Sequence, residues 1–292
     1  MKLSKFYNLV IKFGIQHDPR KGRPVARYFP DTALLNGSGD TEVKKILMGI
    51  DMEVPELLLA DTIRTREGLD LVISHHPEGP AYAALYEVMQ LQVDMLVKVG
   101  VAKKVAEELL KARKDEVERK ILPQNHMRSV DAARLLGLPF MCMHTPADNQ
   151  VAHFLSELMR KKKPKIVNDI IDILSEIQEY KEAQAIGAGP RIILGHPNRI
   201  VGKIFLEMTG GTEGSKDVYD KLYRRGIRTL VSMHLSEEHF KKVKDANLNV
   251  VIAGHISSDT LGLNLLLDKI EQEGGEKFEV INCSGFRRIK RN

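Results

Sequence analysis

The sequence predicts an α/β protein on three observations. From residue 43 to the C-terminus, apolar strand-like runs alternate with stretches of helical periodicity, as in sheets whose strands are connected by helices. The strand-like runs are continuously apolar, which is expected of strands covered on both faces. Five of them end in His, in the letters VISHH, MCMH, IILGH, LVSMH and VIAGH. Because ligands of open α/β folds bind beyond the carboxyl ends of parallel strands, these histidines are the first candidates for a functional site.

The N-terminal part contains one predicted β-α-β unit. Residues 1–42 show no sustained period, and the letters NGSGD near the end of this stretch predict a turn or loop. Residues 43–51 and 69–76 are apolar runs that predict strands. The predicted helix between them, 54–68, has Pro55 in its first turn, where proline is well tolerated.

The middle of the chain is mainly helical, and the alternation resumes towards the C-terminus. Pro123 is expected to break the second of two long helical stretches. The predicted helices are 81–99, 102–136, 146–163, 166–177, 216–225, 237–246 and one that ends at Glu273, and the predicted strands are 139–144, 191–196, 201–208, 228–234, 249–255 and 278–284.

The composition is that of a soluble globular protein. A chain of 292 residues with 43% hydrophobic and 28% charged residues can bury a sizeable core, as one large domain or two smaller ones. No apolar run approaches the roughly 20 residues that span a membrane, and the first residues show no cleavage site, which predicts a cytoplasmic protein. Cys142 and Cys283 lie in apolar runs, so buried thiols are favoured over a disulfide.

Three basic clusters are candidates for contact with phosphates. They lie at 17–24, 160–165 and 287–292, in a chain whose net charge is +5. The better interpretation is solvated loops and helix ends, because no aromatic residues interleave the clusters to stack on bases.

The adjacent histidines His75 and His76 suggest metal chemistry. Neighbouring residues of an extended strand point to opposite faces, so both rings reach one site only if the strand ends there. Pro77 supplies that condition, because it disfavours helix at His76 and cannot continue a ladder. Two ions about 3.5–4 Å apart, as in two-metal hydrolytic sites, would then each take one imidazole. The alternative is an ordinary polar loop.

Two later strand endings pair a histidine with an aspartate four residues on. In HTPAD, Asp148 is a candidate carboxylate ligand, and the alternative is a helix start with Thr145 as N-cap. In GHISSD, His255 and Asp259 share a face if the chain turns helically, and the alternative is a helix start capped by serine. Together with the HHP motif these endings offer three imidazoles and two carboxylates, a plausible ligand set for two divalent ions.

The order of these motifs resembles the Nif-three-like family (NGG-one-interacting factor three), also called GTP cyclohydrolase I type 2-like. The resemblance extends from about residue 43 to the C-terminus. It implies two related lobes with mixed sheets flanked by helices, a dinuclear metal cleft between them, and often a hexameric ring. It also implies His75, His76, Asp148, His255 and Asp259 as the metal ligands. The family usually has Glu where this chain has Asp259, one methylene shorter.

The resemblance predicts one Nif-three-like domain over 1–292. Lobe one is expected at about 43–160, with a helical insertion at 94–136, and lobe two at about 190–292. A helical segment at about 161–185 would connect them.

Two further features are weaker. The loop GGTEGSKD at 210–217 precedes a predicted helix and could bind phosphate there, but it does not fit the P-loop spacing, and a plain turn is favoured. In MHLSEEH, His234 is a candidate acid or base of the cleft, and His239 is expected at the surface.

These features favour a metal-dependent hydrolase. The two ions (Zn, Fe, Mn, Co or Ni) would lower the pKa of a bound water, and His144 or His234 would move protons. The expected substrate is a small molecule such as a nucleotide, or another phosphorylated or heterocyclic compound, and the expected state is a homo-oligomer. The alternative is a non-catalytic regulatory or metal-handling protein that binds nucleotide, nucleic acid or protein partners.

Overall fold

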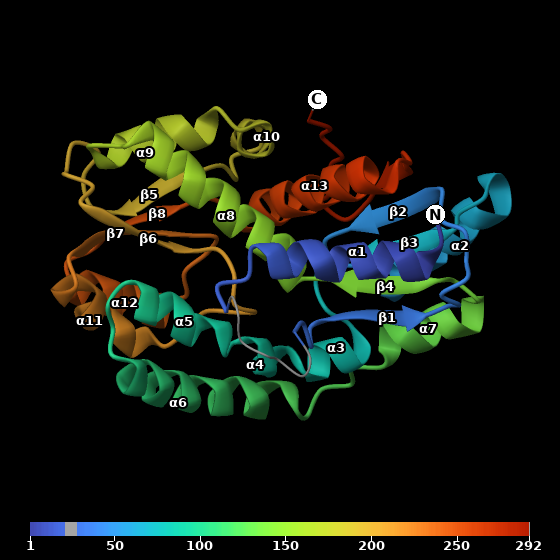
Figure 1. The fold of residues 1–292 in the computed structure, drawn as a ribbon, viewed down its shortest axis with the longest axis horizontal. Helices are drawn as coiled ribbons and strands as arrows, with labels where there is room; N and C mark the ends of the chain where they lie inside the picture. The colour runs from blue at the N-terminus through green and yellow to red at the C-terminus, as the bar shows by residue number, and fades with distance from the viewer. Residues whose placement is uncertain (21–27, 292) are drawn as a thin grey trace. The chain divides into compact units, whose positions relative to one another are not determined.

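The computed structural model describes residues 1–20 and 28–291, so residues 21–24 of the first basic cluster lie outside the described residues. The elements alternate as an α/β protein requires (Figure 1). The strands are β1 (Thr32–Asn36), β2 (Lys45–Gly49), β3 (Leu71–Ser74), β4 (Phe140–Met143), β5 (Arg191–Leu194), β6 (Lys203–Glu207), β7 (Ile227–Ser232), β8 (Asn249–Ile252) and β9 (Glu279–Asn282). The helices are α1 (Leu3–Gln16), α2 (Val54–Glu67), α3 (Gly79–Ala83), α4 (Leu85–Val88), α5 (Leu91–Lys98), α6 (Lys103–Ile121), α7 (Arg128–Leu136), α8 (Thr145–Lys162), α9 (Val167–Ser175), α10 (Gln178–Ala185), the 3-10 helix η1 (Lys216–Val218), α11 (Tyr219–Arg224), α12 (Glu237–Asp245) and α13 (His255–Gly274).

The chain divides into two compact units that are interleaved in the sequence. The first unit contains 1–88, 117–150 and 259–292, and the second contains 89–116 and 151–258. The chain therefore passes from one unit to the other directly after α4 and again within α6, α8 and α13. The single domain with consecutive lobes stays a prediction.

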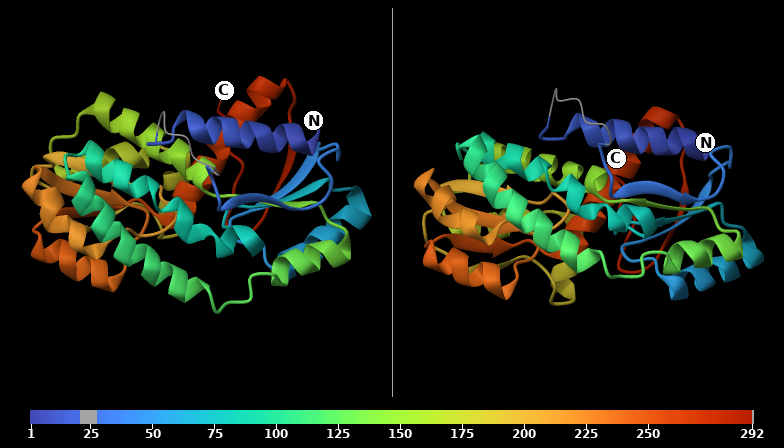
Figure 2. Two further views of the ribbon diagram at one scale, coloured as in Figure 1. Left: turned by 60° about the horizontal axis from the view of Figure 1, so that its bottom comes forward. Right: turned by 90° about the horizontal axis from the view of Figure 1, so that it is seen from below.

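The first unit is a five-stranded mixed sheet in the order β1-β4-β3-β2-β9. Strand β1 is antiparallel to β4, and the other strands are parallel. Successive side chains of each strand enter opposite layers of core: Ile46 and Met48 pack with α1 and α13, whereas Leu47 packs with α2 and α7. Figure 2 shows these two helical layers on either side of the sheet. Burial on both faces explains why the strands are continuously apolar.

Helix α1 was not predicted, and the expectation that residues 1–42 lack regular structure is wrong. Leu3, Phe6, Val10 and Phe13 recur at helical spacing and are all buried in the core of the first unit. Charged residues such as Lys12 lie between them, so the apolar stripe is narrow. The ring of Phe6 packs edge-on against Phe278, 5.4 Å between centroids.

The second unit repeats the strand order of the first. Its sheet is β5-β8-β7-β6, with β5 antiparallel to β8 and the others parallel. Strands β5 to β8 therefore correspond one by one to β1 to β4. Helix α9 packs on β5 and β8, and α11 packs on β7. The predicted α/β class is confirmed, as two mixed sheets flanked by helices.

The predicted elements after residue 43 are largely confirmed, with differences in the helical middle. The stretch 81–99 is divided into α3, α4 and α5, and α6 ends at Ile121, just before Pro123, as expected. Helix α10 lies within the helical segment expected at about 161–185. Both cysteines are free thiols, and Cys142 is buried. No helix among the described residues combines the length and apolar character needed to cross a membrane.

The packing of α1 generates the first prediction. Phe6→Ala removes a fully buried ring and should lower the free energy of unfolding by about 3–5 kcal/mol. Lys5→Ala, at the exposed neighbouring position, is the matched control and should change it by less than about 0.5 kcal/mol. Equal urea midpoints for the two variants would show that α1 is not part of the core.

Candidate metal centre

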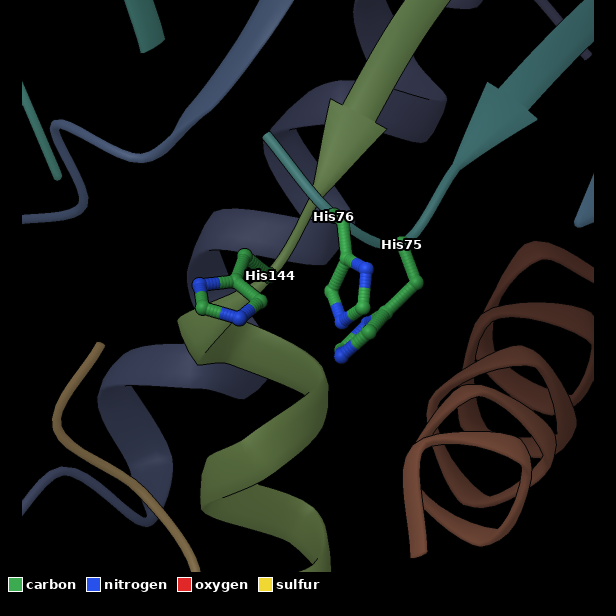
Figure 3. Close-up of side chains that lie close together, drawn as sticks. All are labelled: His75, His76 and His144. Atoms are coloured by element: carbon green, nitrogen blue, oxygen red, sulfur yellow. The ribbon is translucent and has the colours of Figure 1, made fainter. Parts of the chain in front are cut away.

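His75 and His76 come directly after β3, which ends at Ser74. The backbone N–H groups of His75 and His76 still donate to Gly49 and Ile50 carbonyls at 2.9 Å, and the Ser74 hydroxyl donates to the His76 carbonyl at 2.8 Å. These bonds define a local turn in which both rings lie near each other, 5.3 Å between centroids. Figure 3 shows both rings and that of His144, which comes after β4, pointing toward one another.

In each of these three histidines, Nδ1 lies within hydrogen-bonding distance of an acceptor on a residue other than the three histidines. Nδ1 of His75 lies 3.2 Å from the Met143 carbonyl, Nδ1 of His76 lies 2.6 Å from Asp51 Oδ1, and Nδ1 of His144 lies 2.8 Å from Asp31 Oδ2. An imidazole whose Nδ1 donates such a bond has its Nε2 available as a ligand or proton acceptor. One ring nitrogen from each of the three histidines lies within 4.8 Å of the other two.

Two carboxylates complete the cluster. Asp148 is in the first turn of α8, and Asp259 is in α13. Nε2 of His75 lies 3.4 Å from Asp148 Oδ1 and 3.5 Å from Asp259 Oδ1, and Nε2 of His76 lies 3.5 Å from Asp259 Oδ2. His75, Asp148 and Asp259 are a second group whose ligand atoms lie within 4.8 Å of one another. All of these side chains belong to the first unit.

The carboxylates change the protonation of the two adjacent histidines. Burial lowers the pKa of His75, but Asp259 and Asp148 outweigh it and raise that pKa to about 10. Burial also lowers the pKa of His76, and Asp259 and Asp51 raise it to about 9. In the metal-free protein, protons on these two imidazoles therefore offset part of the negative charge of the carboxylates.

The donor set fits a divalent transition metal. Imidazole and carboxylate together suit Zn, Fe, Mn, Co or Ni. Within the described residues, Nε2 of His75 and Oδ1 of Asp148 are buried and make no hydrogen bond, although buried polar atoms are normally paired. A cation placed among these atoms would satisfy both.

Neither of the alternative helix caps, by Thr145 or by the serines after His255, is present. The Thr145 hydroxyl donates to Asp31 Oδ2 at 2.6 Å instead of capping α8, and Asp148 lies beside His75 and not at the N-terminal backbone. Helix α13 already begins at His255, so Ser257 and Ser258 lie inside it. The Ser258 hydroxyl donates to the Gly254 carbonyl.

His255 and His234 lie in the second unit. His255 is the first residue of α13, one helical turn before Asp259, and its ring packs against that of His234 with centroids 4.8 Å apart. Nδ1 of His234 lies 3.6 Å from Glu213. His239 is buried and bonds Tyr219 at 2.7 Å, so the expectation that it is a surface residue is wrong.

The repeat of the fold extends to these strand ends. Ser232 ends β7 and donates to the His234 carbonyl at 2.8 Å, as Ser74 does to His76 after β3. His234 thus corresponds to His76, and Met233 stands where the first unit has His75. The spacing from His144 to Asp148 likewise recurs from His255 to Asp259.

Asp31 and Asp51 are site residues that the sequence reasoning missed. Asp51 closes the predicted strand 43–51, so the rule that sites lie at carboxyl ends of parallel strands would have found it. Asp31 precedes β1, which runs antiparallel to β4 and pairs Thr32 with Met143. Its place beside His144 depends on that strand direction, for which the sequence carries no signal.

The glycine loop at 210–217 acts as a turn. The Gln92 amide donates to the carbonyls of Gly210 and Thr212 at 2.8 and 2.7 Å. The last two residues of the loop, Lys216 and Asp217, begin the three-residue helix η1. The plain-turn interpretation therefore fits this loop, and phosphate binding there stays a prediction.

No family model matches the sequence, and no curated protein matches it. Solved structures do match. A NIF3 superfamily protein from Sphaerobacter thermophilus is 26% identical with a TM-score of 0.77, over 95% of this chain and 97% of that chain. Reduced HcgD from Methanocaldococcus jannaschii is 16% identical with a TM-score of 0.56, over 97% of each chain. A Bacillus cereus protein related to NIF3 is 11% identical with a TM-score of 0.51, over 100% of this chain and 98% of that chain.

The last two similarities concern the fold alone. The first covers nearly the whole of both chains at higher identity, and NIF3 is the Nif-three-like family whose motifs the sequence contains. The fold and the motif order agree: this chain is similar over nearly its whole length to a NIF3 superfamily protein, and its resemblance to the Nif-three-like family is confirmed.

Proposed function

We propose that the protein binds two divalent metal ions and is a metal-dependent hydrolase. The observation that carries the proposal is the convergence of His75, His76, Asp148 and Asp259, with buried donor atoms of His75 and Asp148 that make no hydrogen bond within the described residues. His255 is the fifth proposed ligand, because α13 carries it one turn before Asp259.

The proposed chemistry comes from the ligand set. Two such ions, when bound, polarise a phosphoryl or carbonyl group and lower the pKa of an attacking water. His144, buried beside the cluster, is the proposed proton acceptor. His234, which is exposed, is the proposed donor to the leaving group.

The proposed substrate is a nucleotide or another phosphorylated or heterocyclic small molecule. The motif resemblance supports this class, and it also supports a homo-oligomer, with the hexameric ring as the expected form. Asp259 is one methylene shorter than the Glu usual in the family.

The basic cluster at 160–165 gives little support to the non-catalytic, nucleic-acid-binding alternative. Within the cluster at 160–165, Arg160 pairs with Glu157 at 2.6 Å and Lys162 pairs with Glu176 at 2.7 Å. These acids reduce the positive charge that a nucleic acid would meet. We therefore favour the hydrolase over a nucleic-acid-binding regulator.

Metal analysis tests the site. The purified protein should contain stoichiometric divalent metal, and His75→Ala or Asp148→Ala should lose it, because each removes a proposed ligand. His153→Ala, at an exposed position, is the matched control and should keep the metal. Unchanged metal content in the His75 variant would refute the site.

Metal binding should release protons. At pH 7 both His75 and His76 are in the protonated, imidazolium form in the metal-free protein, because their pKa values are about 10 and about 9. A metal ligand must be unprotonated, so Zn²⁺ affinity should rise between pH 6 and 9, by about tenfold per pH unit for each proton displaced. Calorimetry in two buffers of different ionisation enthalpy measures the protons, and identical heats would contradict the prediction.

A substrate screen separates an enzyme from a binding protein. Nucleotides and phosphodiesters are incubated with the protein loaded with Zn²⁺, Mn²⁺, Co²⁺, Ni²⁺ or Fe²⁺. A hydrolase should turn over at least one of them, and the same preparation of His75→Ala should not. Tight nucleotide binding without turnover would favour the non-catalytic alternative.

A further inference from the structure

Asp31 is a buried carboxylate with donors directed at one of its oxygens. The residue is fully buried and directly precedes β1. Its Oδ2 accepts from the Thr145 hydroxyl at 2.6 Å and from the Thr145 backbone N–H at 3.3 Å, and it lies 2.8 Å from Nδ1 of His144.

This arrangement determines which ring nitrogen of His144 carries hydrogen. Oδ2 of Asp31 already accepts from the Thr145 hydroxyl and backbone N–H, so this oxygen acts as an acceptor. We therefore assign Nδ1 of His144 as an N–H that donates to it. In the neutral ring the lone pair is then on Nε2, which lies 3.8 Å from Asp148 Oδ2, beyond hydrogen-bonding distance.

The lone pair faces the metal ligands. The ring of His144 lies 5.0 Å from that of His75 and 5.8 Å from that of His76, measured between centroids. His144 is itself held on the backbone side, since its N–H donates to Thr32 Oγ1 at 3.1 Å. Asp31 and Thr32, at the start of one edge strand, thus fix both the ring and the backbone of His144.

We propose that Asp31 is a positioning residue that holds His144 in the tautomer with hydrogen on Nδ1, and so presents Nε2 as the proton acceptor beside the metal ligands. The assignment of that acceptor to a reaction rests on the proposed function. The tautomer itself does not. The pair has the logic of a carboxylate–imidazole dyad, in which the acid orients the base and keeps its own charge.

Nitrogen NMR of the imidazole rings in the metal-free full chain tests the tautomer. His144→Gln identifies the ring signals by their loss. The wild-type signals should show hydrogen on Nδ1, and Asp31→Ala should shift them to the Nε2–H form or to a mixture. Hydrogen on Nε2 in the wild type overturns the proposal, and so does an unchanged tautomer in Asp31→Ala. The wild-type measurement decides even if the alanine variant does not fold.

Two further variants isolate the carboxylate. Thr145→Val removes another donor to the same oxygen and should leave the tautomer of His144 unchanged. Asp31→Asn replaces the acceptor-only carboxylate with an amide whose NH2 group donates to Nδ1, and it should shift the ring hydrogen to Nε2. A change of tautomer in Thr145→Val would assign the orienting role to the threonine and overturn the proposal.

Metal content separates this proposal from the proposed function. Asp31→Ala should retain the zinc that His75→Ala loses, because His144 is an acceptor of protons and not a ligand. If the wild type holds zinc and Asp31→Ala does not, His144 is a metal ligand and the proposed role as proton acceptor is overturned. A wild-type protein without metal would refute the proposed function, while the tautomer result would stand.

Discussion

The site depends on the common direction of β2, β3 and β4. Because these neighbouring strands are parallel, their carboxyl ends lie at one edge of the sheet, and the residues directly after them are brought together. The register pairs Gly49 with Ser74 and Ser74 with Cys142, so the three strands end at nearly the same level of the sheet. A slip of one residue would turn each side chain to the opposite face, and His75 would no longer face Asp148.

Burial makes the interactions around this edge necessary. The strands are covered on both faces, so the polar groups at their ends have little access to water, and His75 is fully buried. A buried imidazole needs a partner at each nitrogen. The Nδ1 atoms find carbonyl or carboxylate acceptors in the surrounding chain, which leaves the Nε2 atoms to the centre. The hydrogen bonds at the Nδ1 atoms therefore also fix the direction in which the Nε2 atoms point.

Local sequence pattern was enough to predict one part of the site, but not the parts that depend on strand direction or on a narrow apolar stripe. The continuous apolar runs and the turn at Pro77 were sufficient to place His75 and His76 at a strand end. The edge strand β1, which Asp31 precedes, is antiparallel to β4, so its N-terminal end meets the carboxyl end of β4, and no local sequence signal reports this. Helix α1 was missed although Phe6 and Phe13 recur at helical spacing, because a lysine directly precedes each of them.

The internal repeat separates what the fold supplies from what the side chains supply. The four strands of the second sheet have the same order as β1 to β4 of the first, and both units have the same serine contact after the third strand. The first unit places His75 next to His76 at that point, whereas the second has Met233 before His234. Among the described residues, no group of three possible ligands forms within the second unit alone. The fold thus provides two similar strand ends, which differ at this position in an imidazole of the first unit and a thioether of the second.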